Sequence, residues 1–194
     1  DNYYIIFSIN ISYLMLMNIL FTPIEYIEIL FIQNLIVLLI YQLILIVGSK
    51  YYEIHINIPN LITNFRLIIN IYLFSMILNI NLISLDLILF FALISLVLDG
   101  LDGKLSRLTG NSTKFGYVFD QEVDNILMFI LVISLIVNYA YNPLIILIPL
   151  YRYIFLGLIM CKIISSDNLP PSTYRKIVCS SMIAVLIITN YFNN

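Results

Sequence analysis

Charged residues are scarce in this 194-residue chain, since only 10% are Asp, Glu, Lys or Arg while 62% are hydrophobic. A soluble domain contains about 25% charged and about 45–50% apolar residues. The shortage of charge excludes a separate soluble domain of any size and predicts an integral membrane protein.

Cysteine and histidine are nearly absent as well. Cys161 and Cys179 lack the C-x-x-C spacing of metal and redox sites and lie in or beside apolar stretches, so we expect them to be packing residues. The single histidine, His55, has no second histidine with which to bind a metal, and we expect an interfacial polar residue there. Neither residue type therefore offers a metal-binding pattern.

Long apolar segments dominate what is present. A membrane span takes roughly 20 mainly apolar residues. Seven segments meet this requirement: 3–22, 28–48, 60–80, 83–101, 117–139, 143–163 and 174–192. The first has no basic front end, so we interpret it as a span and not as a cleavable signal. These segments predict an all-α polytopic membrane protein, a bundle of about seven transmembrane helices with a tight turn at 79–83.

Basic residues outside the spans predict the orientation of the bundle. They fall at three junctions that share one side if the spans alternate: Lys50, Lys104, Arg107, Lys114, Lys162, Arg175 and Lys176. The opposite junctions, at 23–27, 79–82 and 140–142, contain no Lys or Arg. By the positive-inside rule, the segment between the fourth and fifth spans faces the cytoplasm.

Two arginines, Arg66 and Arg152, lie inside predicted spans. A charge at mid-bilayer costs about 2.5–3.5 kcal/mol on insertion scales, so such residues usually face the bundle interior and pair. The first two predicted spans carry no paired charges inside, and residues 1–50 are expected to form an accessory hairpin. The functional domain is expected at 58–194.

Four aspartates flank the junction between the fourth and fifth spans. Asp99 and Asp102 are three residues apart, and Asp120 and Asp124 are four apart, so each pair shares a helix face. The short connection makes the two helices antiparallel neighbours, and all four carboxylates can converge. Hard divalent cations take such oxygen ligands, and Mg²⁺ commonly combines carboxylates with substrate phosphates. The pattern therefore predicts a metal and a phosphate-bearing substrate.

Small residues accompany the aspartates. Gly103 and Gly116 would let a ligand approach the helix backbone, and Ser106 lies on the same face as Gly103. The simplest alternative is a charged loop with acidic helix caps, which suits Asp120 but not Asp99, because Asp99 follows an apolar run near a predicted helix end. A calcium loop is excluded because the stretch lacks the D-x-[DN]-x-[DN]-G spacing.

The stretch resembles the signature of the CDP-alcohol phosphotransferases, D-x2-D-G-x2-A-R-x8-G-x3-D-x3-D. The residues that match at every spacing are Asp99, Asp102, Gly103, Arg107, Gly116, Asp120 and Asp124. The one departure is Ser106, where the family has Ala. IPNLITNFR at 58–66 and PLYRYIFL at 149–156 resemble further helices of the family, and the resemblance covers about 58–192. The family core has six spans, and five follow residue 58, so its last helix is expected to be missing or truncated.

The resemblance implies transfer of a phosphatidyl group from CDP-diacylglycerol to a small alcohol with release of CMP, a step in phospholipid biosynthesis. It implies that Asp99, Asp102, Asp120 and Asp124 bind Mg²⁺ or Mn²⁺, with two ions expected, and that Asp124 is also the catalytic base. Gly103, Ser106 and Gly116 would contact the cytidine, and Arg107 the diphosphate. It also allows a homodimer. No nucleic-acid partner is expected.

The acceptor stays open. An anion pocket of Arg66, Arg152, Arg175 and Lys176 would favour a phosphorylated acceptor, and we lean towards glycerol 3-phosphate over inositol phosphate. Inositol, serine or an amino alcohol would need fewer cations, and Arg175 and Lys176 also fit simple positive-inside anchors. Two other functions compete, an inactive membrane scaffold and an ion-pathway protein. The latter would spread acidic residues through the bilayer depth, whereas here they cluster at one level.

Overall fold

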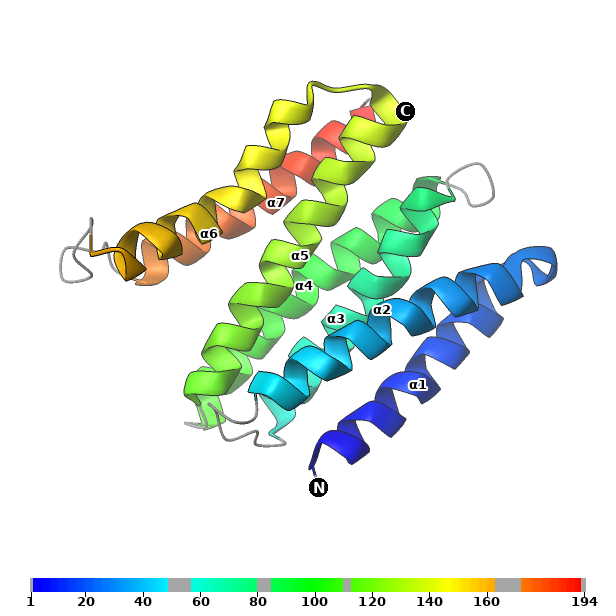
Figure 1. Ribbon diagram of the computed structural model, residues 1–194, viewed down its shortest axis with the longest axis horizontal. Helices are drawn as coiled ribbons and strands as arrows, with labels where there is room; N and C mark the ends of the chain where they lie inside the picture. Colours follow the sequence, from blue (N-terminus) through cyan, green and yellow to red (C-terminus); the bar gives the residue numbers. More distant parts are fainter. Residues whose placement is uncertain (1, 49–56, 80–84, 110–112, 163–171, 193–194) are drawn as a thin grey trace. The chain divides into compact units, whose positions relative to one another are not determined.

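The computed structural model describes residues 2–48, 57–79, 85–109, 113–162 and 172–192. These ranges contain seven α-helices and two short 3₁₀ helices and no strand, which confirms the expected all-α class (Figure 1). The α-helices are α1 (Asn2–Phe21), α2 (Ile27–Gly48), α3 (Ile58–Leu78), α4 (Leu85–Thr109), α5 (Lys114–Tyr139), α6 (Leu147–Met160) and α7 (Ser172–Phe192). The 3₁₀ helices are η1 (Ile24–Tyr26) and η3 (Pro143–Ile146).

The helices form two compact units, Asp1–Val123 and Asp124–Asn194, with the boundary inside the continuous helix α5. Within the described residues, three helical segments are long and apolar enough to cross a membrane: Ile24–Ile44, Ile58–Leu78 and Phe115–Tyr139. Three shorter apolar helices accompany them, at Ile6–Phe21, Pro143–Ile159 and Ile177–Phe192.

Helix α3 is the centre of the first unit. Pro59 lies in its first turn, where a missing backbone N–H costs nothing. Most residues between Pro59 and Ile77 are buried, because α3 packs against α1, α2 and α4. Its buried residues include polar ones such as Asn64 and Asn70, which need hydrogen-bond partners in an apolar interior.

Polar side chains of α3 bind the helical hairpin α1–α2. The amides of Asn10 and Asn64 are reciprocally hydrogen-bonded, with N···O distances of 3.3 and 2.5 Å. Thr22 and Tyr72 share a hydrogen bond of 2.8 Å between their hydroxyls. The Ser75 hydroxyl donates to the side-chain oxygen of Asn34 on α2. Interhelical hydrogen bonds in membrane proteins average about 0.6 kcal/mol each, so together they fix the rotation and depth of the hairpin on α3.

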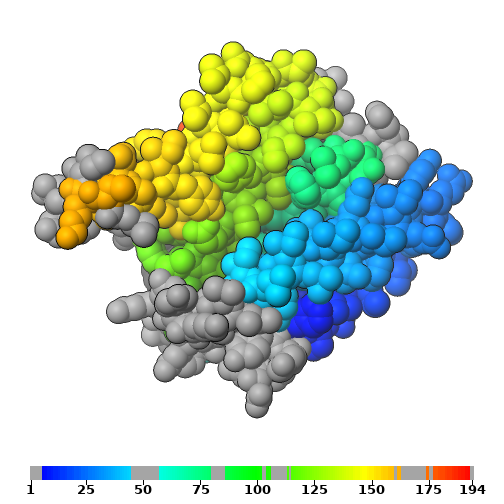
Figure 2. Space-filling view, in the orientation of Figure 1, coloured from blue at the N-terminus to red at the C-terminus, as the bar shows by residue number. Residues whose placement is uncertain are grey.

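The outer face of α2 is aliphatic. In Figure 2, α2 crosses the face turned towards the viewer. Its exposed side chains include Ile29, Ile32, Ile36, Leu39, Ile40, Leu43 and Ile44. An exposed aliphatic surface on a helix with a polar inner face suits contact with lipid tails.

The second unit contains the remainder of α5, η3, α6 and α7. The Asn142 side chain accepts a hydrogen bond of 3.0 Å from the backbone N–H of Leu144 and so caps η3. Asn190 of α7 donates its side-chain amide to the Leu131 carbonyl of α5 at 3.3 Å. Phe129 of α5 and Tyr153 of α6 have ring centroids 6.4 Å apart. Both later helices thus contact α5.

The helix bounds differ from the expected spans around the acidic stretch. Helix α4 continues to Thr109, well beyond residue 101, and α5 begins at Lys114 and not at residue 117. The stretch is therefore mostly helical, and Asp99 lies inside α4 and not at its end.

Other predictions made for single residues have different outcomes. Cys161 is exposed, so the prediction that it is a buried packing residue is wrong. The tight turn at 79–83 lies almost wholly outside the described residues, as does His55.

Candidate metal centre and active site

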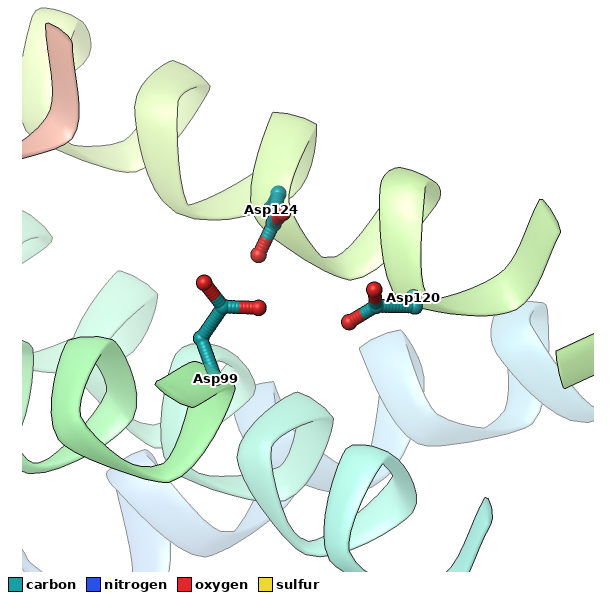
Figure 3. Close-up of side chains that lie close together, drawn as sticks. All are labelled: Asp99, Asp120 and Asp124. Carbon is teal, nitrogen blue, oxygen red and sulfur yellow. The ribbon is translucent and has the colours of Figure 1, made fainter. Parts of the chain in front are cut away.

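Three carboxylates converge between α4 and α5. Asp99 on α4 and Asp120 and Asp124 on α5 each place one oxygen within 4.8 Å of the others (Figure 3). The aspartates of α5 are buried, and Asp99 is partly buried. Figure 3 shows the carboxylates of the two helices turned towards one another. The structure thus brings together three of the four aspartates that the sequence singled out.

The start of α5 explains how its two aspartates reach this position. The Thr113 hydroxyl accepts a hydrogen bond of 3.0 Å from the backbone N–H of Gly116, as an N-terminal cap does. A helix that begins there carries Asp120 in its second turn and Asp124 one turn later, on the same face. Because α5 is continuous across the boundary between the units, Asp124 follows Asp120 directly along this face.

Arg66 is a buried cation of the same cluster. Its side chain is fully buried, and its Nη1 lies 2.8 Å from Oδ1 of Asp120 and 3.2 Å from Oδ1 of Asp99. Its Nε donates to the Ser95 carbonyl at 3.1 Å. The sequence grouped Arg66 with the acceptor-binding cations, whereas its side chain lies against the carboxylates. Pairing of an intramembrane arginine inside the bundle agrees with the cost of leaving it alone.

A second polar contact lies one turn further along α3. The Asn70 amide donates to the Val123 carbonyl of α5 at 3.1 Å. Its oxygen accepts from the Ser95 hydroxyl of α4 at 2.9 Å. Asn70 and Ser95 are both fully buried. One amide side chain therefore joins the two helices that carry the aspartates.

The donor set fits a hard divalent cation. Carboxylate oxygens are the ligands that Mg²⁺ and Mn²⁺ prefer, and oxygens from three residues lie close enough to share an ion. Arg66 pairs with two of these carboxylates, and a divalent cation would add two further positive charges. The arrangement can hold such an ion beside a phosphate-bearing substrate.

Other predicted site residues are placed only in part. Asp102, Gly103, Ser106 and Arg107 belong to α4, and their side chains lie outside the part that the structure describes, as do those of Arg175 and Lys176 on α7. Arg152 belongs to α6 of the second unit and is partly buried. Its expected place at the acceptor stays a prediction.

Gly116 has a close neighbour in the structure. A Cβ atom at this position would lie 2.5 Å from Oδ1 of Asn60 on α3 and 3.1 Å from Oγ1 of Thr113. The absence of a side chain therefore lets Asn60 approach the backbone of α5. Contact of Gly116 with a nucleotide stays a prediction.

Three polar residues near the cluster were not identified from sequence. Ser95 lies four residues before Asp99, and Asn70 lies four after Arg66, so the helical repeat of the charged positions was the available signal. Asn125, next to Asp124, is fully buried, and neither polar atom of its side chain has a hydrogen-bond partner in the described residues. Its sequence context, VDNIL, contained no such signal.

Comparison with known proteins identifies the family. The family model of CDP-alcohol phosphatidyltransferases matches residues 56–193, which is more than half of the chain. No curated protein and no solved structure matches the chain significantly. The matched region includes α3 to α7 and therefore Arg66 and the three clustered aspartates. The chain is thus an all-α membrane protein that belongs to the CDP-alcohol phosphatidyltransferase family.

Proposed function

We propose that this chain transfers the phosphatidyl group of CDP-diacylglycerol to a small alcohol and releases CMP, at the cytoplasmic face of a membrane. The observation that carries the proposal is the convergence of Asp99, Asp120 and Asp124 in a member of a transferase family. Residues 58–194 carry the chemistry, with the hairpin 1–50 as an accessory element packed on α3.

The carboxylates of Asp99, Asp120 and Asp124, with Asp102 from the signature, would hold two divalent ions, Mg²⁺ or Mn²⁺. Such ions, when bound, neutralise charge on a diphosphate and make a nearby hydroxyl easier to deprotonate. Phosphoryl-type transfer depends mainly on charge neutralisation and in-line positioning, which a rigid, buried carboxylate cluster supports.

Asp124 is the proposed general base. It accepts the proton of the acceptor hydroxyl while that oxygen forms a bond to the phosphorus that carries diacylglycerol. The bond between this phosphorus and the CMP oxygen breaks, and CMP leaves with the electron pair. Arg107 would bind the diphosphate, and Gly103, Ser106 and Gly116 would contact the cytidine.

For the acceptor we favour glycerol 3-phosphate, with inositol, inositol phosphate, serine and amino alcohols as alternatives. Arg66 contacts Asp99 and Asp120, so we assign it to the carboxylate cluster. Arg152, Arg175 and Lys176 then supply the positive charge for a phosphorylated acceptor. A homodimer is compatible with this arrangement.

The test is CMP release from CDP-diacylglycerol by the chain in membranes, with Mn²⁺ or Mg²⁺ and each acceptor in turn. Asp124→Asn should lower the rate by about 10²–10⁴-fold, the usual contribution of a general base. Asp86→Asn is the matched control, because Asp86 is exposed in the first turn of α4 and outside the cluster. Its rate should equal that of the unaltered chain.

Two results would contradict the proposal. Equal activity of Asp124→Asn would exclude Asp124 as the base. Absence of both CMP release and CDP-diacylglycerol binding, in a folded chain, would leave the inactive scaffold as the better function.

A further inference from the structure

Building on the proposed function, we propose that Asn70 and Ser95 are positioning residues for the metal site. With Arg66, they set the depth and rotation at which α4 and α5 present their aspartates. All the contacts that carry this inference lie within the first compact unit.

The contacts form two levels along α3, one helical turn apart. At the first level, Arg66 binds the Ser95 carbonyl of α4 at 3.1 Å and the Asp120 carboxylate of α5 at 2.8 Å. At the second level, Asn70 binds the Ser95 hydroxyl at 2.9 Å and the Val123 carbonyl of α5 at 3.1 Å. The same two helices are thus joined twice, both times through α3.

Each contact lies next to a proposed metal ligand. Ser95 is one turn before Asp99 on α4, so its position fixes where Asp99 lies along the helix axis. Val123 directly precedes Asp124, and its carbonyl is held by Asn70. A slide of α5 by one residue would move Asp124 by about 1.5 Å. Metal sites tolerate deviations of only about 0.2 Å in ligand distance, so such a slide would dismantle the site.

These polar groups lie deep in the interior, so the loss of one of their hydrogen bonds is costly. Asn70, Ser95 and Arg66 have no exposed surface. In a bilayer interior, a buried amide or hydroxyl that loses its partner finds no water to replace it. The observed register of α4 and α5 satisfies both levels and brings the three carboxylates together. Mutation of residues that orient metal ligands typically lowers metal affinity by about 10–100-fold.

The chain offers a matched control pair. Ser75 of α3 donates its hydroxyl to the side-chain oxygen of Asn34 on α2, as Ser95 of α4 does to Asn70. All four residues are buried. The control pair joins α3 to the hairpin, and in the described part of the chain its hydrogen bonds go to residues of α1, α2 and α3.

The experiment measures Mn²⁺ affinity by electron paramagnetic resonance of the purified chain in detergent, without substrates. The variants are Ser95→Ala and its control Ser75→Ala, with thermal unfolding of the metal-free proteins measured in parallel. We expect similar losses of thermal stability in both variants. We expect Mn²⁺ affinity to fall about 10-fold in Ser95→Ala only.

A double-mutant cycle adds a second, independent readout. Asn70→Leu removes both contacts of the second level, so adding Ser95→Ala to it should weaken Mn²⁺ binding by less than Ser95→Ala does alone. If Asn70→Leu does not fold, the comparison of Ser95→Ala with Ser75→Ala decides.

Unchanged affinity in Ser95→Ala, or an equal loss in Ser75→Ala, would overturn the positioning role and leave the proposed function intact. An unaltered chain that binds no Mn²⁺ would overturn both. The two failures are therefore distinguishable.

Discussion

Arg66 forms a largely buried charge cluster with Asp99 and Asp120. Its side chain is fully buried, and the side chains of Asp99 and Asp120 are only 18% and 13% exposed. Removing one partner of a buried ion pair leaves charges without compensation, which costs far more than the pair contributes. Removal of Arg66 should therefore destabilise the chain most when no metal is bound.

We expect Arg66→Leu to lower the free energy of unfolding of the metal-free chain by about 3–5 kcal/mol. The measurement is unfolding in the presence of EDTA, with Arg152→Leu as the control because Arg152 is only partly buried. A loss below about 1 kcal/mol, as for a surface pair, would show that Arg66 does not compensate the carboxylates.

At Asn125 we expect a substitution to raise the free energy of unfolding, in contrast to Arg66→Leu. Its amide is fully buried, with no hydrogen-bond partner in the described residues. A buried polar group without a partner costs about 1–3 kcal/mol, so Asn125→Leu should raise the stability of the substrate-free chain by that amount. Asn64→Leu is the control, because both ends of the buried Asn64 amide are hydrogen-bonded to Asn10, so this substitution should lower stability. Destabilisation by Asn125→Leu would indicate a polar partner for this amide.

At the scale of the helices, the Asn60 side chain of α3 lies close to the backbone of α5 at Gly116. A Cβ atom on Gly116 would come within 2.5 Å of the Asn60 side chain, whereas a Cβ on Gly100 of α4 would meet open space. Alanine is the better helix former by about 0.8–1.0 kcal/mol. Steric contact and helix propensity therefore oppose each other at Gly116 and not at Gly100.

We expect Gly116→Ala to be less stabilising than Gly100→Ala, because the Asn60 side chain must move away from the new Cβ atom and this offsets the gain in helix propensity. In an Asn60→Ala background the clash disappears, and the same substitution should be neutral or stabilising. Gly100→Ala should stabilise by about 0.5–1 kcal/mol. Thermal unfolding of the unaltered chain, the three single variants and the double variant tests this, and equal effects of Gly116→Ala in both backgrounds would contradict it.

For the whole molecule, the distribution of basic residues predicts its orientation. Lys104 belongs to a junction rich in Lys and Arg, which is predicted to face the cytoplasm, and Tyr141 belongs to a junction without them, which is predicted to face the opposite side. Both residues are exposed, so cysteines placed there can react with a membrane-impermeant maleimide.

In a chain with Cys161 and Cys179 replaced by serine, Lys104→Cys should be labelled only from the cytoplasmic side. Tyr141→Cys should be labelled only from the opposite side. Right-side-out and inverted vesicles separate these outcomes. Labelling of both from the same side would contradict both the orientation and the expected number of crossings between them.

The helical class and the family signature follow from the sequence alone. So does the expectation that Asp99, Asp102, Asp120 and Asp124 converge, which the structure confirms for Asp99, Asp120 and Asp124. These depend on local quantities, since the length of an apolar run and the spacing of residues along a helix follow from the chain alone. The predicted fourth span ends at residue 101, whereas α4 continues to Thr109. Hydropathy shows where the apolar residues end, and helical hydrogen bonding can continue beyond them. A charged helix can extend beyond the span that it contains.

The tertiary structure alone decided which residues surround those aspartates. Arg66 and Asp120 are 54 positions apart, Asn70 and Val123 are 53 apart, and Asn70 and Ser95 are 25 apart. Such contacts depend on the rotation and depth of whole helices, which are selected jointly by apolar packing and by the cost of leaving buried polar groups unpaired. No single segment contains that information. It was therefore the packing of α3 against α4 and α5 that placed Arg66 among the carboxylates.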